Sequence, residues 1–83
     1  METRVALIGI LVSDTSSVEQ LNQLLHEYGD YIIGRMGIPY KKQNLSIMSI
    51  ALDAPQNVIS ALSGKLGALS GVSTKTVMPK ISD

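Results

Sequence analysis

The chain changes from a helical to an extended pattern within His26-Glu-Tyr-Gly-Asp-Tyr-Ile-Ile-Gly-Arg-Met-Gly-Ile-Pro-Tyr40. This stretch contains the single histidine, all three tyrosines and three of the seven glycines of the sequence. Glycine loses more backbone entropy on folding than any other residue, so a cluster of glycines usually marks unusual backbone angles or a close backbone approach. We therefore expect this stretch to contain the boundary between a helix and a strand, together with the most informative candidate functional residues.

The residues before this stretch predict an amphipathic helix. Side chains that favour the N-cap fill positions 14–17, and apolar residues then recur at helical spacing. These apolar residues are Val18, Leu21, Leu24, Leu25 and Tyr28. Glu19 suits the positive end of the helix dipole, and Gly29 is expected to end the helix at the C′ position.

A second helix is predicted after Asp53 and Ala54, with Pro55 in its first turn, where a missing N–H is tolerated. Its apolar face consists of Val58, Ile59, Leu62, Leu66 and Leu69. Gly64 and Gly67 should weaken its last turns by about 1 kcal/mol each relative to alanine. Close packing of the helix on a sheet would explain why glycine stands at both positions.

Four segments rich in branched apolar residues predict strands, at residues 3–13, 30–38, 45–52 and 72–78. With the two helices, the order of elements is β-α-β-β-α-β. This order is typical of an α+β, ferredoxin-like fold, in which both helices cover one face of a four-stranded antiparallel sheet. Right-handed crossovers then place the first and third strands in the centre, and residues 1–83 form a single domain.

The two central strands are apolar on both faces. In the first strand, Ala6, Ile8 and Ile10 alternate with Val5, Leu7 and Leu11, and the third strand shows the same character. Helices can cover only one face, and a soluble monomer rarely exposes an apolar patch of this size. We therefore expect a homo-oligomer, a dimer or a tetramer built as a pair of dimers, whose interface uses whichever of the two sets faces away from the helices.

Composition excludes several classes of function. The chain has no cysteine and one histidine, which excludes disulfides, cysteine nucleophiles and thiolate metal sites. The formal charge is zero, with seven basic and seven acidic residues, so we expect no nucleic-acid partner held by charge. The apolar run 5–12 is too short to span a membrane and is followed at once by polar residues, so we expect a buried strand in a cytoplasmic protein with no membrane partner.

Three segments in combination carry a resemblance to a known family. They are Leu25–Tyr40, Ile59–Gly67 and Leu69–Val72, and the similarity extends over essentially the whole chain. Together they resemble the proposed iron-only hydrogenase system regulators. The resemblance implies an ACT-like, ferredoxin-fold domain with a regulatory role in an iron-only hydrogenase system.

A more distant similarity links the chain to the C-terminal domain of nickel-responsive repressors, which tetramerises and binds nickel through three histidines and one cysteine. His26 falls on the first ligand position of that pattern. The remaining ligand positions fall on Gly37, Pro39 and about Leu45, which offer no side-chain ligand. The resemblance therefore implies the fold and assembly of those repressors without their metal site, and we expect no stoichiometric metal and no other cofactor.

Two further motifs are similar to binding motifs of other known domains. Amino-acid-binding ACT domains carry Asp-x-Pro-Gly after the first strand, whereas this chain has Asp14-Thr15-Ser16-Ser17, which we interpret as a helix cap. Gly34 and Gly37 match the Gly-x-x-Gly of KH domains, whose loop clamps an RNA backbone. That motif requires a helix directly after the second glycine, and Pro39 with the following residues does not supply one, so a KH-like RNA-binding module is kept as the alternative.

The sequence thus predicts a small, non-enzymatic, oligomeric regulatory domain with no catalytic residue. The candidate ligand-binding residues are His26 and Arg35, which we expect to bind a small molecule at a subunit interface. Arg35 stands as a charge within an apolar strand. It can form an ion pair between subunits, or it can hold a carboxylate or phosphate through two parallel hydrogen bonds.

Overall fold

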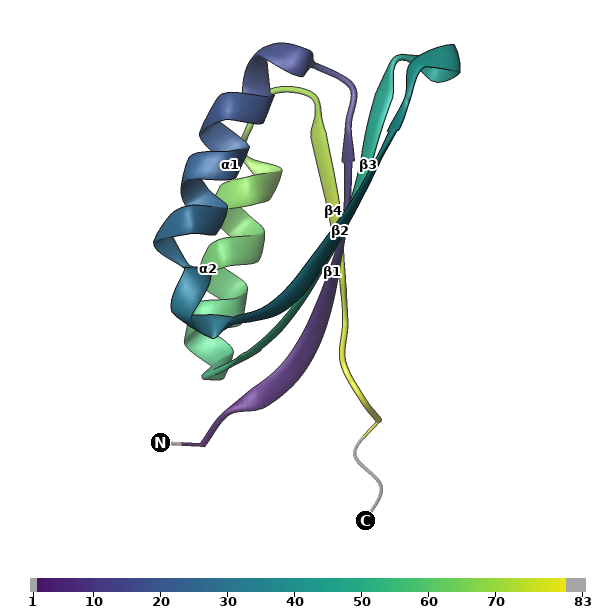
Figure 1. The fold of residues 1–83 in the computed structure, drawn as a ribbon. Helices are drawn as coiled ribbons and strands as arrows, with labels where there is room; N and C mark the ends of the chain where they lie inside the picture. The colour runs from purple at the N-terminus through teal and green to yellow at the C-terminus, as the bar shows by residue number, and fades with distance from the viewer. Residues whose placement is uncertain (1, 81–83) are drawn as a thin grey trace.

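The computed structural model describes residues 2–80 and contains the six predicted elements in the predicted order (Figure 1). The strands are β1 (Arg4–Val12), β2 (Ile32–Tyr40), β3 (Leu45–Ala54) and β4 (Val72–Val77). The helices are α1 (Val18–Glu27) and α2 (Gln56–Gly67). Short 3-10 turns at Thr15–Ser17, Gly29–Tyr31 and Lys41–Gln43 connect them. The α+β, ferredoxin-like βαββαβ prediction is therefore confirmed.

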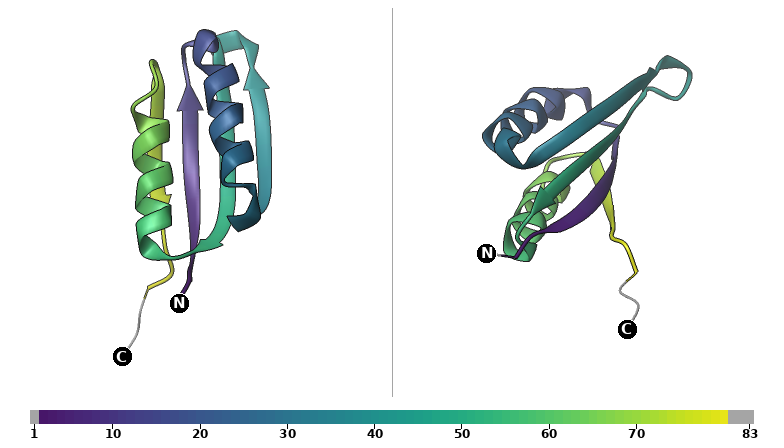
Figure 2. Two further views of the ribbon diagram at one scale, coloured as in Figure 1. Left: turned by 90° about the vertical axis from the view of Figure 1, so that its left-hand side faces the viewer. Right: turned by 60° about the horizontal axis from the view of Figure 1, so that its bottom comes forward.

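The four strands form one antiparallel sheet in the order β2-β3-β1-β4. This order confirms that the first and third strands occupy the centre. Both helices lie side by side on one face of the sheet, and the right-hand view of Figure 2 shows no helix of residues 2–80 on the other face. The two crossovers start from antiparallel strands, β1 and β3, and run across the sheet in opposite directions. Right-handed connections therefore place both helices on the same face.

The hydrophobic core lies between the helices and the sheet. Side chains at Ala6, Ile8, Ile10 and Val12 of β1 all point into it and are almost fully buried. Their register partners on β3, including Ile50 and Leu52, are equally buried. From the helices, the core receives Leu21, Leu25, Ile59, Leu62 and Leu66. The helical periodicity of the sequence therefore identified the buried helix positions correctly.

The opposite face of the sheet, called the open face below, carries the alternate residues of the same strands. Its large apolar side chains remain between 37% and 62% exposed. They are Val5, Leu7, Leu11, Met36, Ile38, Tyr40, Ile47 and Val77. The structure thus decides which of the two apolar sets of β1 faces away from the helices: it is the set of Val5, Leu7 and Leu11.

Several observed ends differ from the predicted ones by one or two residues, and three of these differences have a local reason. α1 ends before Gly29 as predicted, but Gly29 begins a 3-10 turn, so β2 begins at Ile32 instead of residue 30. Pro55 is the N-cap of α2 and does not lie in its first turn. β2 continues through Pro39, because an edge strand tolerates a residue that cannot donate a hydrogen bond.

The β2–β3 hairpin bears on the KH alternative. Gly34 and Gly37 both lie inside β2, and the chain then turns at Lys41–Gln43 through Asn44, which adopts a left-handed conformation with φ 54°. The three-residue 3-10 turn is part of a hairpin and not the helix that follows the glycines in a KH domain. The Gly-x-x-Gly of this chain is therefore part of a strand, and Lys41 and Lys42 lie in the hairpin turn.

The explanation proposed for Gly64 is wrong, whereas that for Gly67 holds. A Cβ atom added at Gly67 would lie 3.4 Å from Thr74 Oγ1 on β4, at the boundary between a tight and an ordinary contact. A Cβ atom added at Gly64 would have no neighbour within 4 Å. Close packing on the sheet therefore accounts for only one of the two glycines of α2.

We predict that Gly64→Ala stabilises the protein by up to about 1 kcal/mol, because alanine costs less backbone entropy in a helix interior and meets no obstruction at this position. Urea unfolding followed by circular dichroism measures this change. Gly67→Ala serves as the matched comparison, and it should gain less because Thr74 must move. A Gly64→Ala protein that is less stable than the original would contradict the described environment of this residue.

Candidate functional site

Arg35 extends from the edge strand β2 on the side of the helices. Its register partner on β3 is Ile50, which lies in the core, so Arg35 emerges on the same face as the buried apolar residues. The edge position keeps the side chain exposed. Its Nη2 donates a hydrogen bond of 3.1 Å to Oδ1 of Asn22 on α1. The guanidinium group of Arg35 is therefore held between α1 and β2 by a neutral hydrogen-bond partner.

A cleft with a volume of about 190 Å³ lies beside this hydrogen bond. It is lined by Val18 and Asn22 of α1, by Arg35, Gly37, Ile38 and Pro39 of β2, and by Ser46, Ile47 and Met48 of β3. Its walls are mainly apolar, and Arg35 supplies the one charged side chain of the lining. A guanidinium group has five N–H donors in a planar fork, which matches a carboxylate or phosphate group. The cleft thus contains the groups that recognition of a small anion requires.

Asn22 is the residue of this cleft that sequence reasoning missed. It lies one helical turn after Val18 and one turn before His26, so the three residues follow the same side of α1 at i, i+4 spacing. That spacing was visible in the sequence. The pairing of Asn22 with Arg35 was not visible, because it depends on how α1 crosses the edge of the sheet.

The structure does not bring the two predicted ligand residues together in one cavity. His26 occupies an exposed position in the last turn of α1 and is not part of the lining of the Arg35 cleft. Among residues 2–80, no group of three or more His, Cys, Asp and Glu side chains is arranged to hold a metal ion. Gly37 and Pro39, which stand at histidine positions of the nickel repressor pattern, both line the cleft and offer no ligand atom from a side chain.

The loop after β1 is occupied by internal hydrogen bonds. Oδ1 of Asp14 accepts hydrogen bonds from the backbone N–H of Ser16 at 3.0 Å and from its hydroxyl at 2.6 Å. These bonds lower the pKa of Asp14, first through the Ser16 hydroxyl and then through its backbone N–H. The buried Ser17 hydroxyl donates to the carbonyl of Ser70 at 2.6 Å. The loop therefore caps the following helical segment, as the sequence predicted.

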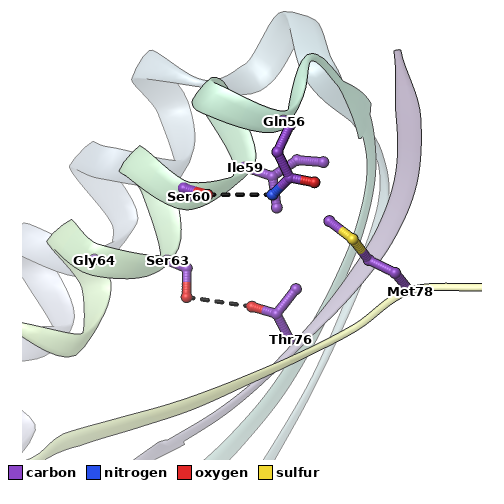
Figure 3. A pocket seen from close by; sticks show the side chains of 7 residues that line it. All are labelled: Gln56, Ile59, Ser60, Ser63, Gly64, Thr76 and Met78. Atoms are coloured by element: carbon purple, nitrogen blue, oxygen red, sulfur yellow. Dashed lines mark hydrogen bonds between the residues drawn. The ribbon is translucent and has the colours of Figure 1, made fainter.

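A larger cavity, of about 590 Å³, lies between α2 and β4 (Figure 3). Its polar side chains form hydrogen bonds with one another and with a neighbouring side chain. Gln56 donates to Ser60 at 3.2 Å and Thr76 donates to Ser63 at 3.2 Å, while Arg4 donates to the Gln56 carbonyl oxygen at 3.1 Å. Among the described residues, its lining contains no charged side chain. The smaller Arg35 cleft is the better candidate site, because it offers a charge that can recognise a ligand.

No helix among residues 2–80 has the length and hydropathy needed to cross a membrane.

Lys65 of α2 donates a hydrogen bond of 3.0 Å to the Tyr28 hydroxyl at the end of α1, and its ammonium group lies 5.3 Å from the centre of that ring. This hydrogen bond is the main cause of the raised pKa of Lys65. Tyr28 therefore links the two helices, and its contacts are structural.

Comparison with known proteins agrees with this fold. Uncharacterized protein TM1266 from Thermotoga maritima is 39% identical, with a TM-score of 0.91 over 95% of this chain and 100% of that chain. A formyltetrahydrofolate deformylase from Pseudomonas putida KT2440 is 10% identical, with a TM-score of 0.65 over 90% of this chain and 29% of that chain. An unknown protein from Galdieria sulphuraria is 14% identical, with a TM-score of 0.64 over 99% of this chain and 48% of that chain. The last two show a shared fold alone.

No protein of the curated comparison gives a significant match. A family model does match the chain, over residues 4–76, and it carries the description "TM1266-like: Iron-only hydrogenase system regulator, putative". That range runs from the start of β1 to within β4 and includes both helices. The chain therefore belongs to the TM1266-like family of proposed iron-only hydrogenase system regulators.

Proposed function

We propose that this protein is a non-enzymatic regulatory domain that responds to a small anionic ligand bound in the Arg35 cleft. Membership of a family described as a regulator supports the regulatory role. The absence of cysteine agrees with action in the reducing cytoplasm. The observation that carries the ligand proposal is the placement of an exposed arginine in the lining of a mainly apolar cleft, with a neutral amide as its hydrogen-bond partner.

The cleft favours binding over acid–base chemistry. Asp14 and Lys65 have displaced pKa values, and in both cases a neighbouring hydrogen bond is the main cause. Both residues lie outside the cleft. A general acid or base usually sits in the site with a pKa tuned by its surroundings. What the cleft does supply is a fixed cation, an amide and an apolar wall, which together suit recognition of an anion.

The size of the cleft narrows the ligand class. Pockets for drug-sized ligands are typically about 300–1,000 Å³, whereas this cleft measures about 190 Å³. It therefore suits a short carboxylate or a single phosphate group with little attached to it. Arg35 would bind the anion through two parallel N–H···O bonds, and Asn22 would hold the guanidinium in place.

We predict that a small anion raises the melting temperature of the protein and that Arg35→Gln abolishes this response. The test panel consists of inorganic phosphate, acetate and succinate at millimolar concentration. At ten times its Kd, a ligand that binds only the folded state adds about 1.4 kcal/mol of stability. For a domain of this size, that corresponds to a rise of roughly 6–11 °C.

The matched control is Arg4→Gln, because Arg4 also donates to a side-chain amide oxygen at 3.1 Å but lies away from the cleft. It should leave the anion response unchanged. Arg35→Lys should reduce the response, since lysine cannot form the paired hydrogen bonds of a guanidinium. A panel in which no anion gives a saturable shift, or a shift that Arg35→Gln retains, would rule out this site.

A further inference from the structure

The large and small side chains of the open face form rows across the strands. The register places Ile38, Ile47, Leu11 and Ser73 in one row. The next row consists of Met36, Ser49, Gly9 and Lys75, and the one after it of Gly34, Ala51, Leu7 and Val77. The middle row is therefore low at its two central strands, beside Ile47 and Leu11 of one neighbouring row and Leu7 of the other.

Gly9 creates a hollow in the centre of the open face. A cavity of about 310 Å³ lies over it, flanked by Leu11, Ile47, Ser73 and Lys75. A Cβ atom added at Gly9 would meet only the carbonyl oxygen of Lys75 at 3.8 Å, which is an ordinary contact. The isolated chain thus has room for a side chain here. Glycine inside a strand weakens it and often marks a place where another chain approaches closely.

We propose that two copies of this chain stack their open faces about a two-fold axis that runs across the strands between Gly9 and Leu11. At the two central strands, this operation places the large residues of one copy over the small residues of the other. Leu11 of each copy then enters the hollow over Gly9 of the other. The inference does not depend on the Arg35 cleft, which lies on the helix side of the sheet.

Most of the remaining contacts that follow from the same axis are complementary in size. The exception is Met36 of β2, which meets Ile38 of the other copy and whose flexible side chain can adapt to it. Ile47 of each copy lies over Ser49 of the other, and the hairpin residue Tyr40 lies over Gly34. A Cβ atom added at Gly34 would have no neighbour within 4 Å, so the isolated chain does not require glycine there either. Both open-face glycines are therefore explained by the second copy, because each receives a large side chain from it.

Charge and area agree with this arrangement. Lys75 lies over Ser73 of the other copy at the margin of the sheet, so the two lysines do not face each other. Asp53, at the far end of β3, points toward the turn that carries Lys41 and Lys42 in the other copy. The four strands contain 9, 9, 10 and 6 residues and cover a projected area of about 540 Å² at ~4.8 Å between strands and ~3.3 Å per residue. Side chains that project from the sheet add accessible surface, which brings the area buried per copy toward the roughly 800 Å² that stable interfaces bury.

The test measures dimer dissociation by sedimentation equilibrium across the micromolar range, with circular dichroism as the check of folding. The original chain should be a dimer. Gly9→Leu should raise the dimer Kd by about 100-fold or more, because two symmetry-related contacts become overpacked while the monomer has room for the new side chain. Gly64→Leu is the matched control on the exposed side of α2, and it should leave the Kd unchanged.

A second variant tests the register itself. Leu11→Ala alone should weaken the dimer, and Leu11→Ala combined with Gly9→Leu should restore a Kd within about tenfold of the original, because the large and small side chains have exchanged places. Should Gly9→Leu fail to fold alone, the Leu11→Ala protein still decides whether this face is the interface. A monomeric original chain, a Gly9→Leu dimer as tight as the original, or a double variant weaker than both single variants would overturn the proposal. Loss of the anion response in the Arg35 variants would leave these measurements unaffected.

Discussion

Ile8→Asp is expected to unfold the chain. Ile8 lies at the centre of β1, its exposed fraction is 0%, and it packs among the buried side chains between the sheet and the helices. Loss of the isoleucine alone should cost about 2–5 kcal/mol, and burial of an unpaired carboxylate adds several kcal/mol more. The total is comparable to the whole stability of a domain of this length, roughly 4–12 kcal/mol.

The neighbouring substitution Leu7→Asp is the matched control, and we expect it to leave a folded chain. Leu7 is on the same strand but points to the open face, where 45% of it is exposed. The carboxylate can remain hydrated there in a monomer. Circular dichroism and urea unfolding of the two proteins distinguish these outcomes. An unfolded Leu7→Asp chain together with a folded Ile8→Asp chain would show that the two faces of β1 had been assigned the wrong way round.

Gly71→Ala is expected to destabilise the protein by at least about 3 kcal/mol, through backbone strain of about 1–2 kcal/mol and a steric clash. Gly71 adopts φ +69°, and an added Cβ atom would lie 2.5 Å from Asp14 Cβ and 2.8 Å from Asp14 N. Relief of this clash would separate two loops that are held together by Ser13. The backbone N–H and the hydroxyl of Ser13 donate to the Gly71 carbonyl oxygen at 2.8 and 3.1 Å.

Urea unfolding measures this loss, and Gly29→Ala provides the comparison. Gly29 has no neighbour within 4 Å of an added Cβ atom and is not among the residues with positive φ. It should therefore tolerate alanine with a change of a few tenths of a kcal/mol. Equal effects at the two positions would contradict the close approach of the two loops at Gly71.

Of the candidate site, Arg35 could be predicted from the sequence, whereas its partner could not. The residue stood out because it is a charge within an apolar strand. Its partner Asn22 lies thirteen residues earlier, on α1. Which residue of α1 meets Arg35 depends on how the helix packs across the edge of the sheet. His26 was grouped with Arg35 because both lie in one informative stretch. In the structure Arg35 lines the cleft and His26 does not, since the cleft lies beside Asn22, one helical turn before His26.

The sequence by itself determined the order of the elements, the fold class and the presence of two apolar faces on the central strands. These properties are local: they depend on the 3.6-residue and two-residue periods and on capping residues such as Asp14. Only the tertiary structure decided that Ile8 is buried and Leu7 exposed, that Gly71 meets Asp14, and that Gly64 meets nothing. A period shows which side chains share a face, whereas the choice of the buried face depends on contacts between residues far apart in the chain.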